Sequence, residues 1–236
     1  MWWAVSAVAP NEFRMRVAYR KTGRVRFLSH LEVMRALERS VRRSGLPYAV
    51  THGFSPRMKL AFGPALPVGT AALREHFDVW TTRYVPADEA MRALSAATPA
   101  DLAPHAVAYV ALAEPSLGAA VTLAEYDVYL EGEEVTEEAV QEALDAVIGS
   151  GRLEVEHKGK QKVFDLARSL PKEVRARSTG SGVTVSVTTR MGQEGSLRPD
   201  MLCTVALSRA RSGGAVVSVT RTDTLIETEE GPRRPL

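Results

Sequence analysis

The sequence predicts an α+β protein made of two tandem ferredoxin-like halves, each with the element order β-α-β-β-α-β. Strands are predicted where apolar and polar residues alternate, as they do at 13–19 (FRMRVAY). Helices are predicted where apolar residues recur every three or four positions between a capping residue and a glycine. Because this order occurs twice, we predict domains at 13–113 and 120–226, followed by a flexible tail at 227–236.

The first half contains a helix with clear boundaries. Ser29 and Glu32 form a capping-box pattern, in which the serine hydroxyl accepts a bond from the N3 amide and the glutamate reaches back to the cap. Gly45 ends this helix. The apolar residues expected to face the core are Leu31, Met34, Leu37 and Val41. The remaining predicted elements are strands at 13–19, 48–52, 76–82 and 107–112, and a helix that begins at Pro86.

The second half follows a linker near residues 113–120. Thr136 caps a helix with Glu137 and Glu138 in its first turn, where acids complement the helix dipole. Residues 158–181 fit no element clearly. The other predicted elements are strands at 121–130, 153–157, 183–189 and 216–220, and a short helix from Pro199.

Charge is distributed unevenly along the chain. The net charge is only +2, yet residues 13–59 contain twelve Lys and Arg and two acids, whereas residues 114–148 contain ten acids and no Lys or Arg. Clustered cations favour an anionic partner such as RNA. Two alternatives stay open: the two charged segments attract each other across a domain interface, or the cations dock an acidic protein.

Composition excludes several classes of protein. No segment approaches the roughly 20 apolar residues of a membrane helix, so no membrane partner is expected. The opening residues lack the basic start of a signal peptide, and the single Cys203 suits a reducing compartment, so we expect a cytoplasmic protein. One cysteine excludes an iron–sulfur cluster and a multi-cysteine zinc site, and we expect no cofactor or metal.

Long motifs in the sequence resemble a known family. The motifs are SHLEVMRALERSVRRSGLP and HGFSPRMKLAFGPALPVG within 29–69, GSLRPDML at 195–202 and VTRTDTL at 219–225. They resemble DUF2344, the radical-SAM-linked family of uncharacterised proteins. The sequence departs from the family pattern at Arg57-Met58, where a His/Pro-type pair is expected. The element order is also similar to that of the RAMP superfamily of CRISPR RNA-processing endonucleases.

The resemblance implies a partner rather than a reaction. Members of the family are fused to, or encoded beside, B12-binding-type radical SAM proteins, and their own activity is unassigned. The resemblance therefore implies an accessory protein that binds tRNA or rRNA, or presents a substrate, to a radical SAM partner. One cysteine cannot form the radical SAM cluster motif, so this chain would be the accessory alone.

Arginine side chains suit phosphate because their planar guanidinium groups bind it through two hydrogen bonds. Nearby aromatic residues could stack on the bases of a single strand. The residues predicted to bind nucleic acid or another anion are Arg20, Lys21, Arg24, Arg26, Arg35, Arg39, Arg42, Arg57, Lys59, Arg198 and Arg221.

The glycine- and proline-rich segment 54–69 is the strongest single candidate site, because a purely structural loop has little need for both Arg57 and Lys59. We expect this apolar segment to lie against the body of the protein. The residues singled out here are His52, Gly53, Phe54, Ser55 and Gly63. The glycines would allow a ligand or a backbone segment to approach closely.

An enzyme is the main alternative. His30, near a helix N-terminus, and His52 could serve as acid and base in a metal-independent RNA endonuclease or RNA-modifying enzyme. Arg198, at the start of the short helix, could bind an anion or form an ion pair. Cys203, on an apolar helix face, is expected to be a packed thiol rather than a nucleophile.

Overall fold

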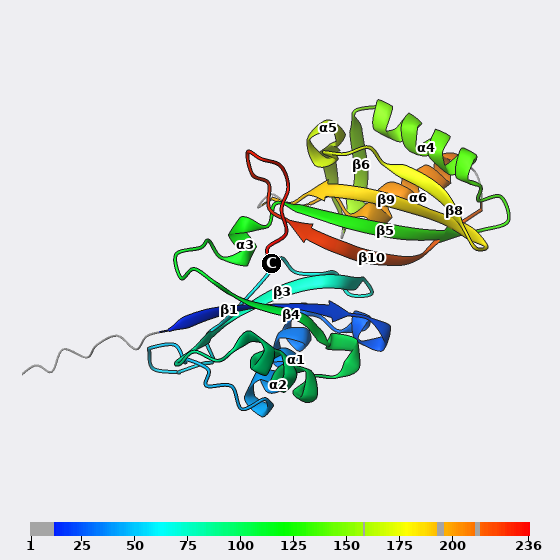
Figure 1. Ribbon diagram of the computed structural model, residues 1–236. Helices are drawn as coiled ribbons and strands as arrows, with labels where there is room; N and C mark the ends of the chain where they lie inside the picture. Colours follow the sequence, from blue (N-terminus) through cyan, green and yellow to red (C-terminus); the bar gives the residue numbers. More distant parts are fainter. Residues whose placement is uncertain (1–11, 158, 193–195, 211–212) are drawn as a thin grey trace, which may run out of the picture.

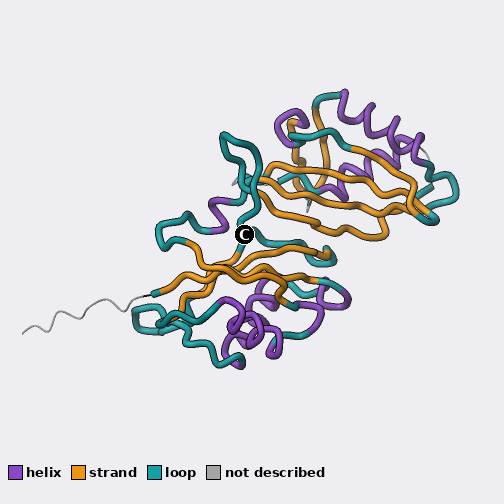
Figure 2. The backbone as a smooth tube through the Cα atoms, in the orientation of Figure 1, coloured by secondary structure: helices purple, strands orange, loops and turns teal. Residues whose placement is uncertain are grey.

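The computed structural model describes residues 12–157, 159–192, 196–210 and 213–236. The protein is α+β, as predicted. Its main feature is an eight-stranded mixed sheet with the order β4-β1-β3-β10-β5-β9-β8, in which β2 also pairs with β3 (Figure 1). Each half of the sheet has helices on one side (Figure 2). No helix among the described residues is long and apolar enough to cross a membrane.

The N-terminal half, residues 13–113, has β1 at its centre. Its strands follow the order β4-β1-β3-β2, and each neighbouring pair is antiparallel. Helices α1 and α2 cover one face, where Met15, Leu37 and Leu94 belong to one buried core. The elements are β1 (Phe13–Lys21), η1 (Gly23–Phe27), α1 (His30–Arg43), β2 (Leu60–Phe62), β3 (Ala71–Thr81), α2 (Ala87–Ala97), η2 (Ala100–Leu102) and β4 (Pro104–Val110).

Two predictions for this half were wrong. The strand expected at 48–52 is reduced to isolated bridges at Tyr48 and Val50, because residues 50–58 turn back on themselves, and the strand at this position in the sheet is β2. Leu31 is 62% exposed rather than buried. The predicted core residues Leu37 and Val41 are buried and Met34 is half-buried, and Val33 and Ser40 complete the buried stripe of α1.

The C-terminal half, residues 120–226, has strands in the order β10-β5-β9-β8, also antiparallel. The strand predicted at 153–157 lies outside the main sheet, in a separate hairpin of β6 and β7, and β8 takes its place. The linker forms the short helix α3 (Leu117–Ala120). The elements of this half are β5 (Leu123–Glu131), α4 (Glu137–Gly149), β6 (Arg152–His157), β7 (Lys160–Asp165), α5 (Leu166–Ser169), β8 (Arg175–Thr179), β9 (Gly182–Arg190), α6 (Pro199–Ala210) and β10 (Ala215–Leu225).

The two halves join edge to edge. β10 pairs in parallel with β3 through only two register positions, Thr220 opposite Ala71 and Arg221 opposite Ala72. His76 of β3 adds a contact between its Nδ1 and the Thr224 hydroxyl of β10 at 3.2 Å. So short a ladder needs support from side chains, and the junction supplies it through buried charges.

One buried ion network lies on β1 and β3. Asp78 accepts hydrogen bonds from Arg14 Nε at 2.9 Å and from Arg16 Nε at 2.7 Å, and all three side chains are buried. Arg16 also bonds to Glu114 of the linker at 3.2 Å. The guanidinium of Arg14 donates to the backbone carbonyls of Glu114 and Pro115. Buried charges need such complete pairing, because an unpaired one loses its hydration without compensation.

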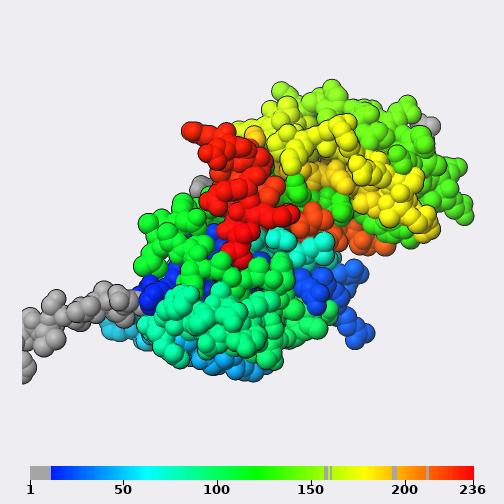
Figure 3. All heavy atoms as spheres, in the orientation of Figure 1, coloured from blue at the N-terminus to red at the C-terminus, as the bar shows by residue number. Residues whose placement is uncertain are grey.

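The segment 227–236 was predicted as a flexible tail, and the structure corrects this. It folds back so that Ile226 bridges Arg233, and the carbonyl of Pro235 accepts a bond from buried Arg16 at 3.1 Å. Arg234 pairs with Asp223 at 2.6 Å. Figure 3 shows this red segment lying across the junction of the two halves. Because its backbone and an arginine side chain bond to buried residues of both halves, the segment is part of the folded structure.

Replacing Asp78 with asparagine tests the ion network. The change keeps the size of the side chain but leaves two buried guanidinium groups without their shared counter-charge, so we expect the free energy of unfolding to fall by about 3–5 kcal/mol. Urea denaturation measures this. The matched control is Asp88→Asn, which breaks an exposed pair with Arg92, and we expect it to cost less than about 1 kcal/mol. Equal small decreases in the two variants would contradict the assignment.

His76 predicts how stability depends on pH. Burial, followed by the charges of Arg16 and Arg74, lowers the pKa of His76 to about 3. The unfolded chain takes up a proton near pH 6.5, whereas the folded chain resists protonation until about pH 3. Stability should therefore fall by about 1.4 kcal/mol per pH unit from this residue below pH 6.5. His76→Gln should show a shallower fall between pH 6.5 and 4 than the wild type. If the free energy of unfolding falls equally with pH in His76→Gln and in the wild type, His76 is not the source of this pH dependence.

Candidate nucleic-acid interface and charged junction

Helix α1 presents a row of exposed arginines. The predicted capping box is confirmed at its start: Ser29 Oγ accepts from the Glu32 amide, and Glu32 Oε2 accepts from the Ser29 amide at 2.8 Å. Because side chains three or four positions apart share a helix face, the core stripe leaves the opposite face to the cations. We call the exposed residues Arg35, Arg39, Arg42 and Arg43 the arginine face.

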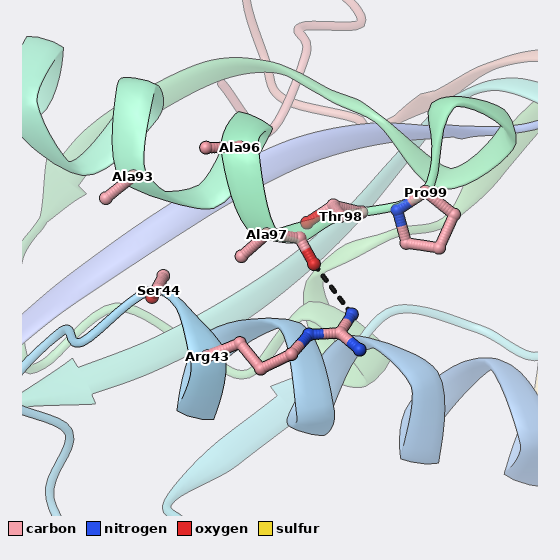
Figure 4. A pocket seen from close by; sticks show the side chains of 7 residues that line it. All are labelled: Arg43, Ser44, Ala93, Ala96, Ala97, Thr98 and Pro99. Atoms are coloured by element: carbon pink, nitrogen blue, oxygen red, sulfur yellow. Dashed lines mark hydrogen bonds between the residues drawn. The ribbon is translucent and has the colours of Figure 1, made fainter.

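Members of the arginine face differ in their partners. Arg42 pairs with Glu38 at 2.9 Å in an exposed contact. Arg43 lies across a surface hollow between the ends of α1 and α2, where its Nη2 donates to the Ala97 carbonyl at 2.7 Å (Figure 4). Arg35 and Arg39 make no side-chain hydrogen bond or ion pair within the described part of the chain. Their guanidinium groups are therefore available to an anion.

Further exposed cations lie near the start of α1. Arg20 is exposed and donates to the Ala100 carbonyl at 2.9 Å. Arg24 is exposed on η1. Arg26 is half-buried and its guanidinium lies 4.8 Å from the ring centre of exposed Phe27. Arg20 and Arg24 are therefore further cations that a partner in solution can reach.

The acid-rich segment 114–148 does not neutralise this surface. Glu131 accepts from the Ser181 hydroxyl at 3.3 Å and Glu137 from the Ser178 amide at 2.7 Å, both within the C-terminal half. Glu114 pairs instead with Arg16 and Arg233. Among the described residues, no ion pair joins this segment to the arginine face.

Three sequence candidates meet at the junction instead of on the surface. Arg221 of β10 donates Nε and Nη2 to the two oxygens of Glu75 of β3 at 2.6 and 2.5 Å, and both side chains are buried. Lys21 is buried and donates Nζ to the Leu28 carbonyl at 2.9 Å. His30 lies close enough for Glu75, Arg221 and Lys21 to act on its charge. We call these four residues the junction cluster.

The site residues predicted from the sequence did not include Glu75, although the sequence contains a signal for it. Glu75, Phe77 and Val79 share one face of β3, because residues two apart point the same way, and this face is buried. A carboxylate at such an inward position indicates a buried counter-charge. Its partner Arg221 could not be assigned, since it lies 146 residues away.

Burial shifts the pKa of two members of the junction cluster. Desolvation lowers the pKa of Lys21, partly opposed by the charge of Glu75. Desolvation also lowers the pKa of His30, and Arg221 and Lys21 act in the same direction, against Glu75. His30 also packs edge-on against Phe62, with ring centroids 6.0 Å apart. The junction cluster therefore holds a neutral imidazole beside paired charges.

The segment that was predicted to lie against the protein does so only in part. His52, Gly53, Phe54 and Ser55 are exposed, whereas Gly63 is half-buried. Arg57 is exposed. Lys59 pairs with Glu12 and lies 5.2 Å from the ring centre of Trp80, so its charge is already engaged.

His30 and His52 fall in different surroundings. His30 is half-buried in the junction cluster, whereas His52 is exposed on the segment 50–58. Within the described residues, no group of three His, Cys, Asp or Glu side chains is placed to hold a metal ion.

The sequence candidates in the C-terminal half are accounted for by packing. Arg198 pairs with Asp200 at 2.5 Å just before α6. Gly195, the first residue of the motif at 195–202, lies outside the described residues. Cys203 is buried, and burial raises the pKa of its thiol to about 12, so it stays protonated at neutral pH.

The chain belongs to the family described as "Uncharacterized protein conserved in bacteria (DUF2344)", which matches residues 14–199. This confirms the family predicted from the sequence motifs. The motif at 219–225, which contains Arg221, lies beyond the matched residues. No curated protein matches the chain.

Among solved structures, the chain is similar to one in "Crystal Structure of a Cbf5-Nop10-Gar1 Complex", with 10% identity and a TM-score of 0.46 over 89% of this chain and 48% of that one. A chain in "Structure of H/ACA RNP bound to a substrate RNA containing 2'-deoxyuridine" gives 11% identity and a TM-score of 0.44, over 89% and 47%. The protein spans about half the length of these chains. Likeness at this level carries no functional argument.

The junction cluster predicts the titration of His30. Because desolvation and the two nearby cations disfavour the imidazolium, His30 should lose its proton below pH 6.5, the ordinary pKa of histidine. NMR titration of the imidazole signals measures this, and His30→Gln identifies the signal that belongs to this residue. A midpoint at or above pH 6.5 would contradict the cluster.

Proposed function

We propose that this protein binds RNA through the arginine face of α1, extended by Arg20 and Arg24. The observation that carries the proposal is that Arg35 and Arg39 are exposed on one helix face with no side-chain partner among the described residues. A guanidinium group binds phosphate through two parallel hydrogen bonds, and RNA offers phosphates in a row. Lys21, Lys59 and Arg221 form no part of the proposed surface, because their charges are engaged within the protein.

The arrangement of charge supports RNA over a partner within the same chain. Acids of the segment 114–148 bond to β8, to the loop before β9 and to the junction, so they leave the arginine face open. Unpaired cations such as Arg35 and Arg39 raise the local concentration of polyanions. An acidic protein would meet the same charge, but its co-purification with this protein would survive nuclease treatment, whereas that of RNA would not.

We also propose that each half is a ferredoxin-like unit. The four principal strands of each half, numbered along the chain, lie in the spatial order fourth, first, third, second. This order is β4-β1-β3-β2 in the N-terminal half and β10-β5-β9-β8 in the C-terminal half, and it supports the proposal. The hairpin of β6 and β7 is then an insertion in the second unit.

The resemblance to radical-SAM-linked proteins supports a narrower proposal, that the bound tRNA or rRNA, or another substrate, is presented to a radical SAM partner. A partner of this kind would co-purify with the protein from native lysate after nuclease treatment. Catalysis by His30 and His52 together has no supporting geometry, since His30 lies in the junction cluster and His52 on the exposed segment 50–58.

Charge reversal on the arginine face tests RNA binding. We expect Arg35→Glu/Arg39→Glu to weaken binding of a single-stranded RNA about 10- to 100-fold at moderate salt. The slope of log affinity against log salt should fall by about 0.7 for each phosphate that the variant no longer neutralises. Fluorescence anisotropy over a salt series measures both quantities.

The matched control makes the same change in net charge on the other half. Arg168→Glu/Arg177→Glu alters two exposed arginines of the C-terminal half, and it should reduce affinity only weakly. Equal decreases in affinity for the two double variants would show that net charge alone drives binding. A wild-type protein that ignores RNA at low salt would refute the function.

A further inference from the structure

The segment 50–58 forms a hairpin that projects from the N-terminal half. Val50 bridges Met58, the Thr51 amide donates to the Arg57 carbonyl at 2.8 Å, and the Arg57 amide donates to the Thr51 hydroxyl at 3.1 Å. These bonds fix the base of the hairpin. The residues between them, 52–56 (HGFSP), are all exposed. The tip is therefore held out from the body by its own hydrogen bonds.

Phe54 at this tip has an exposed fraction of 111%, so the fold buries none of its ring. No other aromatic ring or cation pairs with it among the described residues. Burying a phenylalanine side chain stabilises a protein by about 2 kcal/mol, and this gain is not used in folding. An apolar ring left uncovered in this way suits a partner that covers it.

The charge around the ring indicates what that partner is. Between Glu38 and Glu75 the chain contains no acid, and Arg57 is exposed at the base of the hairpin. A partner that covers the ring and also pairs with Arg57 would offer a flat apolar surface next to negative charge. An unpaired nucleotide does so, because its base stacks on an aromatic ring while its phosphate accepts from arginine. A duplex hides the faces of its bases in the stack, so it offers phosphates and 2′-hydroxyls but no base face to an aromatic ring.

The hairpin is also placed to continue the arginine face. Helix α1 ends at Arg43, and the chain reaches the base of the hairpin at Val50 after a short connection. That connection is tied to the end of β3, because the Thr82 amide donates to the Pro47 carbonyl at 2.7 Å. In the chain, the hairpin is therefore the element that follows the C-terminal end of the arginine face.

We propose that Phe54 stacks on an unpaired RNA base while Arg57 binds the adjacent phosphate, so that the hairpin selects single-stranded over double-stranded RNA. This rests on the proposed RNA-binding function and specifies the form of RNA that is bound. The arginine face supplies affinity through phosphates, which both forms of RNA carry, and the hairpin supplies the preference between them.

The experiment compares a single-stranded RNA with a duplex of the same length by anisotropy, using the full chain. We expect Phe54→Ala to weaken single-strand binding about tenfold or more, the effect typical of removing one stacking ring, and to leave duplex binding within about twofold. Phe54→Trp should retain the preference, because indole also stacks. Since Phe54 buries no surface, Phe54→Ala should fold normally, which circular dichroism and thermal unfolding check.

The control is Val163→Ala, which removes an exposed apolar side chain from the hairpin of the C-terminal half. This variant should bind single-stranded RNA and the duplex with the affinities of the wild type. If Phe54→Ala leaves the ratio of single-strand to duplex affinity unchanged while Arg35→Glu/Arg39→Glu weakens both, the stacking proposal is overturned and the RNA-binding function stands. If the wild type binds neither RNA and Phe54→Ala instead loses a protein partner, both proposals are overturned.

Discussion

Pairing of buried charge at the junction is the constraint on which the structure depends. Arg14, Arg16 and Asp78 lie on one face of the sheet, and the Glu75–Arg221 pair lies on the other, because residues 75 and 78 of β3 point in opposite directions. A charge removed from water without a partner costs several kcal/mol. Arg14 and Arg16 share Asp78 of the same half and gain further partners from the linker and the C-terminal segment, whereas Glu75 of β3 takes its partner Arg221 from β10. Separating the halves would therefore leave the buried charges of Glu75 and Arg221 unpaired.

This constraint divides the cations of the first third into two groups. Cations on strands that enter the junction, such as Arg16 and Lys21, are used within the fold. Cations on the outer face of α1 are left in water, because the core needs only one stripe of that helix. The cations clustered in the first third of the sequence therefore belong to two groups, one buried and paired within the fold and one exposed on the arginine face. Only the exposed group can bind a partner.

The N-terminal half then combines two kinds of contact on one surface. The arginine face offers charge without regard to sequence or strandedness, and the hairpin offers one aromatic ring and one guanidinium group at a fixed position. Charge attracts any polyanion, whereas stacking requires an exposed base. The junction cluster stands apart from this surface and holds the two halves in a fixed relation, which keeps the surface in place.

The sequence by itself determined the α+β class, the capped helix at 30–43, most of the strands and the family, because these depend on local periodicity, caps and contiguous motifs. Tertiary structure alone decided that Arg221 and Lys21 are buried, that β8 replaces β6 in the sheet and that the last ten residues pack across the junction. Each of these outcomes depends on a partner far away in the chain, such as Glu75 for Arg221. The free energy of burying a charged side chain depends on the group that pairs with it. Residue type and spacing do not reveal which distant residue will be that partner.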